Sequence, residues 1–180
     1  MPVWIWGRYD GLLKRSIAAL KYENSPEIAQ FLGEELAKGW FNRAESTLDQ
    51  LVVVPIPMFP EKQKKRGFNQ AELIARSFCQ VTGLPLKPEG LKRIRDTKPQ
   101  FQLSVQDRQA NLKDAFGLGK AFQHRHPHKK VILIDDIYTS GATIKTAIRT
   151  LKRANIKVAG VIAVATTRQP LSTTRIEKKI

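Results

Sequence analysis

Two adjacent carboxylates, Asp135 and Asp136, separate an apolar run from a segment rich in hydroxyl groups. That segment consists of Thr139, Ser140, Gly141, Ala142 and Thr143. Hydroxyls and free backbone N–H groups at the start of a helix favour a phosphate, and glycine lets the backbone approach it closely. Because phosphates repel carboxylates, ligand hydroxyls or a divalent cation suit the acidic pair better. A sugar phosphate with free ring hydroxyls satisfies both halves of the pattern.

A strand and a helix must position these groups. Residues 131–134 are four large apolar residues in succession, which is typical of a strand buried on both faces of a parallel sheet. Beyond the hydroxyl segment, apolar residues from Ile144 to Leu151 recur at helical spacing. The pattern predicts a strand–loop–helix unit with its polar groups at the carboxyl end of the strand, where open α/β sheets bind ligands. A bare acidic pair could instead cap the helix or hold a metal in another α/β fold.

A second unit of the same kind precedes the first. Residues 51–57 predict a strand that its prolines end. A basic loop follows, with Lys65, Arg66 and Gly67 at its end, and a helix is predicted from its cap at Asn69 to Gly83. A cationic loop would suit a pyrophosphate group, although loop lysines are more often solvated than bound to a ligand.

The outer parts of the chain are expected to frame this core. Residues 10–22 and 25–40 predict two helices that precede any strand and form a small cap over the sheet. Lys21 and Tyr22, at the end of the first helix, could face a ligand or solvent. Short strands are predicted at 91–95 and 115–118, separated by a polar connection that is functional or disordered. A last strand at 157–166 would follow a parallel crossover.

Composition narrows the class of protein. A net charge of +15 over 180 residues predicts attraction to nucleic acid, an acidic surface or a phosphorylated small molecule, or else a solvated basic surface. The single Cys79 excludes an internal disulfide and any Cys-based zinc site in this chain. No apolar run approaches the roughly 18 residues of a membrane span, and no secretory leader is evident. We therefore expect a cytoplasmic protein without membrane insertion.

The acidic pair and its hydroxyl segment resemble the 5-phosphoribosyl-1-pyrophosphate (PRPP) signature of type I phosphoribosyltransferases. Further segments resemble the ComF family of competence-associated proteins, so that the similarity runs from about Tyr9 to Thr167. They are residues 9–11 and 19–22, residues 54–57 and 66–70, and, in the polar middle segment, Arg95, Thr97, Gln100, Leu103, Arg108 and Asn111. Many family members begin with a four-cysteine zinc module, which this sequence cannot form.

The resemblance implies an α/β fold, a mostly parallel sheet flanked by helices as in type I phosphoribosyltransferases. It would have an N-terminal helical cap at 1–48 and a core at 49–180. Asp135 and Asp136 would be the catalytic carboxylates that hold the ribose hydroxyls and, indirectly, Mg²⁺. Residues 139–143 would bind the 5-phosphate, and the loop with Lys65, Arg66 and Gly67 the pyrophosphate. Arg95, Gln100 and Arg108 would lie in a flexible loop over the site, although Arg108 could equally pair with Asp107 or Asp114.

Three functions follow as hypotheses from this resemblance. The first is transfer of the phosphoribosyl group from PRPP to an unidentified acceptor, with release of pyrophosphate. The second is a non-catalytic factor that handles single-stranded DNA during natural transformation, for which Lys62, Lys64, Lys65 and Arg66, with Lys92, Arg93 and Arg95, could form a cationic track. The third is a regulator that senses PRPP without turnover. The sequence predicts neither the acceptor nor the oligomeric state.

Overall fold

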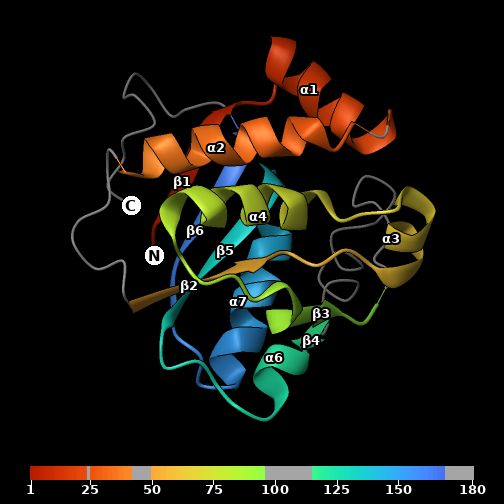
Figure 1. Cartoon of the computed structure of the whole chain (residues 1–180). Coiled ribbons are helices and arrows are strands. Elements are labelled where there is room, and N and C mark those ends of the chain that lie inside the picture. Colours follow the sequence, from red (N-terminus) through yellow and green to blue (C-terminus); the bar gives the residue numbers. More distant parts are fainter. Residues whose placement is uncertain (24, 42–49, 96–114, 169–180) are drawn as a thin grey trace.

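A computed structural model describes residues 1–23, 25–41, 50–95 and 115–168 (Figure 1). In the first half of the chain, the elements are β1 (Val3–Arg8), α1 (Gly11–Tyr22), α2 (Glu27–Phe41), β2 (Leu51–Pro55), α3 (Pro60–Arg66) and α4 (Gln70–Thr82). The second half adds the short 3₁₀ helix η2 (Pro88–Gly90), β3 (Leu91–Arg93), β4 (Phe116–Leu118), α6 (Lys120–Gln123), β5 (Lys130–Tyr138), α7 (Ala142–Arg153) and β6 (Val158–Thr166). Among these elements, no helix is long and apolar enough to cross a membrane.

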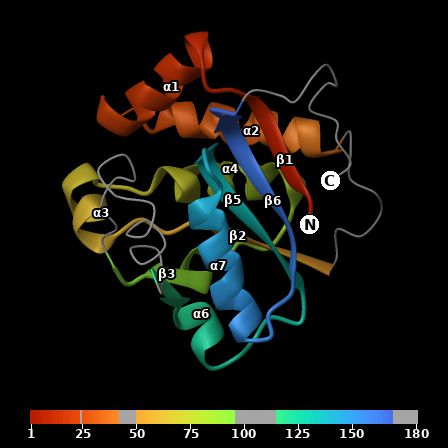
Figure 2. The ribbon, with the colours of Figure 1, turned by 180° about the vertical axis from the view of Figure 1, so that it is seen from behind.

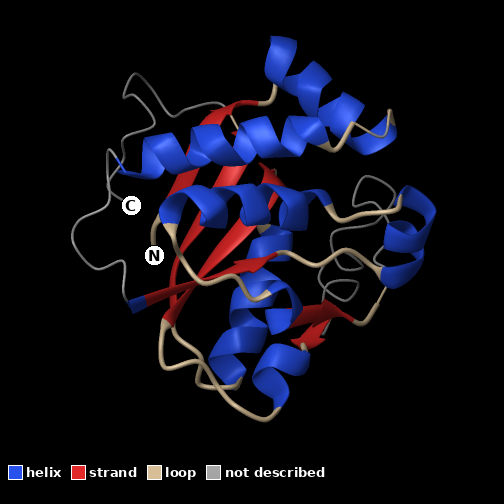
Figure 3. Ribbon diagram, viewed as in Figure 1, coloured by secondary structure: helices blue, strands red, loops and turns tan. Residues whose placement is uncertain are grey.

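The main sheet has the strand order β1-β6-β5-β2, and its neighbouring strands are all parallel (Figure 3). β3 and β4 form a separate antiparallel pair. β5 is an inner strand because it pairs with β2 on one side and β6 on the other. The expected mostly parallel sheet flanked by helices is therefore confirmed, with the acidic pair on an inner strand.

Helices cover both faces of the main sheet, as the alternation of side chains along β5 requires (Figure 2). Ile132 and Ile134 pack into one hydrophobic cluster with buried residues of α1, α2 and α4. Val131 and Leu133 point the other way and pack into a second cluster with α7 and α6. Because both faces of the strand are buried, its apolar residues need no polar alternation, which is why the run is continuous.

Two expectations were wrong, one about the order of the elements and one about the type of an element. β1 precedes both N-terminal helices and pairs with β6 at the edge of the main sheet, so these helices do not precede every strand. The segment expected as a basic loop forms α3, in which Pro60 occupies the first turn and polar residues of high helix propensity follow. Gly67 ends α3 in the left-handed conformation, with φ +88°. The division into a cap at 1–48 and a core at 49–180 stays a prediction.

Candidate functional site

The carboxyl ends of β2 and β5 lie side by side and open into a pocket. Pro55 pairs with Ile134, and the Ile56 N–H donates to the Ile134 carbonyl oxygen over 2.8 Å. Beyond this point the segments that continue from Pro55 and Ile134 line a pocket of about 290 Å³. Its lining residues are Lys21, Ile56, Pro57, Met58, Arg66, Asn69, Gln70, Ala71, Arg93, Asp135, Asp136, Ile137, Thr139 and Thr143. The structure thus brings together residues from the segment after β2, from β3 and β5, and from the ends of four helices, α1, α3, α4 and α7.

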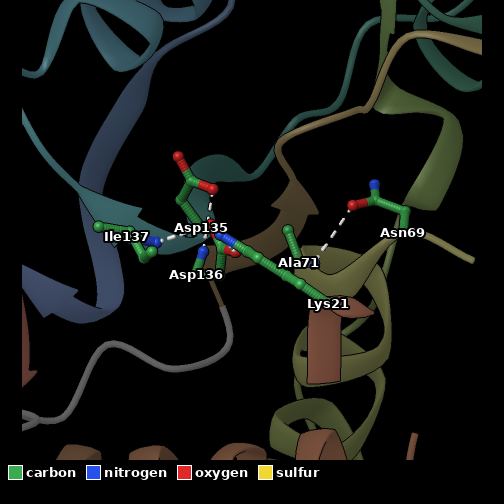
Figure 4. A network of polar contacts seen from close by, with 6 residues as sticks. All are labelled: Lys21, Asn69, Ala71, Asp135, Asp136 and Ile137. Carbon is green, nitrogen blue, oxygen red and sulfur yellow. Dashed lines mark hydrogen bonds and ion pairs between the residues drawn. The ribbon is translucent and has the colours of Figure 1, made fainter. Parts of the chain in front are cut away.

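The acidic pair lines this pocket and takes part in a network of polar contacts (Figure 4). The Asp136 N–H donates to Asp135 Oδ1 over 2.9 Å, and the Ile137 N–H donates to Asp136 Oδ1 over 2.8 Å. The Lys21 ammonium, from the end of α1, lies 2.5 Å from Asp136 Oδ2. Their side chains are only 18% and 15% exposed, so this ion pair belongs to the interior of the site.

Burial raises the pKa of Asp135 well above its usual value, and the neighbouring charge of Asp136 and a hydrogen bond between the two side chains raise it further. A backbone hydrogen bond from Asp136 and the positive charge of Lys21 lower the pKa, but by less. Asp135 therefore holds a proton more readily than an exposed aspartate does. The two carboxyls of the pair stand in different environments, because the Lys21 ammonium contacts Asp136.

The hydroxyl segment connects β5 to α7 in a tight turn. Thr139 and Thr143 line the pocket, whereas Ser140 is exposed and its Oγ accepts from the Ala142 N–H over 3.3 Å. Gly141 has φ +75°, and a Cβ there would lie 2.4 Å from the Tyr138 hydroxyl. The turn therefore requires glycine both for its backbone conformation and for the space above Tyr138.

Arg168 holds this turn from outside the predicted motif. Its Nε donates to the Thr139 carbonyl oxygen over 2.9 Å, and a terminal nitrogen donates to that of Ser140 over 2.5 Å. The guanidinium carbon also lies 5.2 Å from the centre of the Tyr138 ring. Sequence reasoning missed this arginine, because it follows β6 and lies 25 residues or more beyond the segment 139–143 in the sequence.

Of the residues predicted to bind pyrophosphate, Lys65, Arg66 and Gly67, only Arg66 lines the pocket. Arg66 lines the pocket, and its guanidinium lies 5.7 Å from the centre of the exposed Tyr22 ring. Lys65 is exposed and does not line the pocket, and neither does Gly67 at the end of the helix. A helix in place of the expected loop turns successive side chains about 100° apart, so neighbouring residues cannot all face one ligand.

The start of α4 supplies two polar residues of the segment 66–70, which resembles the ComF family but for which no individual ligand contacts were predicted. Asn69 was also expected as a helix cap, and its Oδ1 accepts from the Ala71 N–H over 3.2 Å. Its Nδ2 also donates to the Ile56 carbonyl oxygen over 3.0 Å. Gln70 is 2% exposed, and its Nε2 has no hydrogen-bond partner within the described part of the chain. A buried amide without a partner at a pocket wall is suited to a ligand.

The polar middle segment is only partly described. Arg95 is exposed and is not among the residues that line the pocket. Gln100 and Arg108 lie outside the described residues. Arg93 on β3, expected beside the site, does line the pocket, and its guanidinium lies 5.4 Å from the centre of the Phe116 ring.

The donor set restricts the metal chemistry that this pocket could support. In the described ranges, no three His, Cys, Asp or Glu side chains are grouped as metal ligands. Asp135 and Asp136 supply two carboxylates, and Mg²⁺ is commonly held by one or two carboxylates together with phosphate oxygens of a substrate. The pocket therefore fits a cation that arrives with a phosphorylated ligand better than one held by protein alone.

Comparisons with known proteins agree with this architecture. Residues 63–179 match the family described as phosphoribosyl transferase domain. The chain is 31% identical over 162 residues to competence protein F of Haemophilus influenzae, covering 87% of this chain and 70% of that protein. It is 31% identical over 147 residues to the DNA utilization protein YhgH of Escherichia coli K12, covering 81% of this chain and 63% of YhgH.

Two solved structures are also similar to the chain. Adenine phosphoribosyltransferase of Leishmania tarentolae has a TM-score of 0.47 at 12% identity and is matched over 82% of this chain and 62% of its own. Hypoxanthine phosphoribosyltransferase of Staphylococcus aureus has a TM-score of 0.45 at 15% identity, over 83% and 70%. From the family match and the competence protein F relative, the chain belongs to the phosphoribosyl transferase domain family, among the ComF competence-associated proteins.

Proposed function

We propose that this protein binds PRPP together with Mg²⁺ and transfers the phosphoribosyl group to an acceptor, releasing pyrophosphate. The observation that carries the proposal is the single pocket wall on which Asp135 and Asp136 lie beside Thr139 and Thr143. Carboxylates accept hydrogen bonds from ribose hydroxyls, and the turn before α7 offers hydroxyls and backbone N–H groups to a phosphate. The two groups match the two ends of a ribose 5-phosphate.

The cations of the pocket suit the pyrophosphate end of the same ligand. Arg66, Arg93 and Lys21 all line it, and arginine binds phosphate oxygens in a bidentate manner. Mg²⁺ bound between phosphate oxygens, with Asp135 and Asp136 acting indirectly, would offset the negative charge of the departing pyrophosphate. The chain's own residues would thus position the ribose, the 5-phosphate and the pyrophosphate relative to one another.

Such a transfer needs no protein nucleophile. Positive charge develops on the ribose as the bond to pyrophosphate breaks, so catalysis rests on positioning and on electrostatic stabilisation. Lys21 contacts the Asp136 carboxylate at the pocket. Asp136 would stabilise the positive charge on the ribose through the ribose hydroxyls that it would bind.

Calorimetry with PRPP, in the presence and absence of Mg²⁺, tests the binding step directly. We expect saturable binding that strengthens with Mg²⁺, and no comparable binding of ribose 5-phosphate, which lacks the pyrophosphate. Pyrophosphate release is then measured on adding candidate acceptors. Release with an acceptor supports the transferase, whereas tight binding without release for any acceptor supports a PRPP-sensing regulator. Failure to bind PRPP would remove both.

A second candidate function is the handling of single-stranded DNA in the cytoplasm. It is favoured by the net charge of +15, which exceeds what one PRPP could neutralise, and by relatives named for competence and DNA utilization. The exposed lysines of α3, next to Arg66 at the pocket, would extend the cationic surface away from the site. This function and PRPP binding are compatible, since the exposed lysines of α3 lie outside the pocket lining.

A further inference from the structure

Lys21 is held at the pocket by the packing of α1 rather than by its charge alone. Ile17 and Leu20, on the same helix, are completely buried in the core that covers one face of the sheet. The helix ends with the Glu23 N–H donating to the Ala19 carbonyl oxygen over 2.9 Å. A lysine in the last turn is also favoured by the helix dipole. The fold thus delivers one ammonium group to the acidic pair.

Lys21 and the Ile137 N–H contact different oxygens of the Asp136 carboxylate. Asp136 Oδ1 already accepts from the Ile137 N–H, and Oδ2 lies 2.5 Å from Lys21 Nζ (Figure 4). An exposed pair of this kind contributes little, but here both side chains are more than four-fifths buried. A hydroxyl or cation that approaches Asp136 at Oδ2 must therefore displace Lys21 or share this oxygen with it.

We propose that Lys21 is the resident counter-cation of the acidic pair, which keeps a free divalent cation off Asp136 and moves to a ligand phosphate when the sugar phosphate binds. This inference rests on the proposed function, because the phosphate is that of PRPP. An ammonium and a divalent cation repel each other at one carboxylate oxygen. The flexible four-carbon stem of lysine allows the ammonium to change partner within the pocket that it lines with Thr139, Thr143 and Arg66.

The exchange explains how carboxylates and phosphates share one small pocket. In the free protein the Lys21 ammonium balances the charge of Asp136. When ribose hydroxyls hydrogen-bond to Asp136, the ammonium becomes available to a phosphate oxygen, so neither charge is left without a partner. The metal then enters only as part of the phosphate complex. Lys21 becomes a ligand-binding residue contributed by the N-terminal helical segment, outside residues 63–179 that match the family.

Binding of Mn²⁺ alone, followed by the electron paramagnetic resonance signal of the free ion, tests the first half of the proposal without turnover. Wild type is compared with Lys21→Met and with Lys14→Met, an exposed lysine on the same helix. We expect Lys21→Met to bind Mn²⁺ at least tenfold more tightly than wild type and Lys14→Met. Adding Asp136→Asn to Lys21→Met should abolish the gain. Lys21→Gln, which can still donate a hydrogen bond to Asp136, carries the test if the methionine variant does not fold.

Calorimetry with PRPP and Mg²⁺ tests the second half. Loss of one charge-assisted hydrogen bond predicts an affinity about tenfold weaker or more for Lys21→Met, with Lys14→Met unchanged. Equal Mn²⁺ affinity in all variants, or equal PRPP affinity, overturns the exchange while leaving the proposed function intact. If wild type does not bind PRPP at all, the proposed function fails, and a tighter Mn²⁺ site in Lys21→Met still upholds Lys21 as counter-cation.

Discussion

The Asn69 side chain ties the start of α4 to the end of β2, because its Nδ2 donates to the Ile56 carbonyl oxygen over 3.0 Å while its Oδ1 caps the helix at Ala71. One buried side chain thus fixes the angle between two of the segments that line the pocket. Its removal would affect the site through geometry, without removing a charge.

We expect Asn69→Ala to lower the free energy of unfolding by about 2–4 kcal/mol, from the lost cap and the unpaired buried carbonyl. Asn69→Ser keeps an oxygen that can cap the helix and should lose roughly half as much. Urea denaturation measures both. Glu72→Ala, which removes an exposed pair with Arg76 on the same helix, serves as control and should cost less than about 1 kcal/mol. Equal losses for the alanine and serine variants would contradict a role for the cap, and a serine variant as stable as wild type would contradict a role for the Ile56 contact.

Gly141 and Gly67 offer a matched comparison, since both have positive φ. A Cβ at Gly67 meets no described atom within 4 Å, whereas one at Gly141 would meet the Tyr138 hydroxyl at 2.4 Å. We expect Gly67→Ala to cost about 1–2 kcal/mol from backbone strain alone. Gly141→Ala should cost more and should also weaken PRPP binding, because the turn before α7 must shift. Thermal and urea unfolding, with calorimetry, distinguish the two, and equal stability losses would show that Tyr138 moves aside freely.

The raised pKa of Asp135 predicts that Asp135→Asn increases the free energy of unfolding, relative to wild type, in a pH-dependent way. The native carboxyl binds its proton more tightly than the unfolded one, so wild-type stability falls as pH rises from about 3.8 through the higher native pKa. Asparagine does not titrate and escapes this loss. Urea unfolding between pH 4 and 8 should show the variant gaining on wild type as pH rises, then keeping a constant lead. A difference independent of pH would argue against the raised pKa.

Gln70→Leu should move stability and ligand affinity in opposite directions. The buried amide Nε2 without a described partner destabilises the free protein, so leucine should raise the free energy of unfolding by about 1 kcal/mol. If the amide binds the ligand, affinity for PRPP should fall by roughly fivefold or more. Gln63→Leu, on α3 and outside the pocket lining, is the control. A more stable variant with unchanged affinity would remove Gln70 from the ligand contacts.

Binding to single-stranded oligonucleotides should be independent of sequence and should weaken steeply with salt. The logarithm of affinity should fall with that of salt concentration by about 0.7 for each phosphate contacted. Replacing Lys64, Lys65 and Arg66 by alanine should flatten this slope. A variant with only Lys64→Ala and Lys65→Ala distinguishes the contribution of the exposed α3 lysines from that of Arg66, which lines the pocket. Alanines at Lys129 and Lys130, at the amino end of β5, should leave the slope nearly unchanged. Binding that is absent at low salt, or the same in all variants, would leave the basic surface as a solvated one.

The units that the sequence predicted well are those whose signal is local. The run 131–134, the turn through Gly141 and the apolar spacing of α7 lie within about twenty residues, and all three are present. The cap at Asn69 and the left-handed glycine at Gly83 also follow from neighbouring residues alone. β5 continues to Tyr138, beyond the predicted end, because β6 pairs with it as far as Thr166.

The features that could not be predicted depend on distant partners or lack an apolar pattern. β1 is an edge strand whose partner lies some 160 residues further along the chain. α3 has no buried residue, so no hydrophobic periodicity marks it. The contact of Lys21 with Asp136 joins two residues 115 positions apart, and the sequence suggested only that Lys21 could face a ligand. Arg168 stood outside every motif considered, and Gln70 lay in a segment that resembled the family but had no predicted role of its own.

The pairing of the first strand with the last has a consequence for folding during synthesis. β1 is synthesised well before β6 and finds its hydrogen-bonding partner only when β6, ending at Thr166, has been made. At about 5–20 residues per second, this interval lasts roughly 8–30 s. During it, the peptide groups on both edges of β1 are open to water and to chaperones.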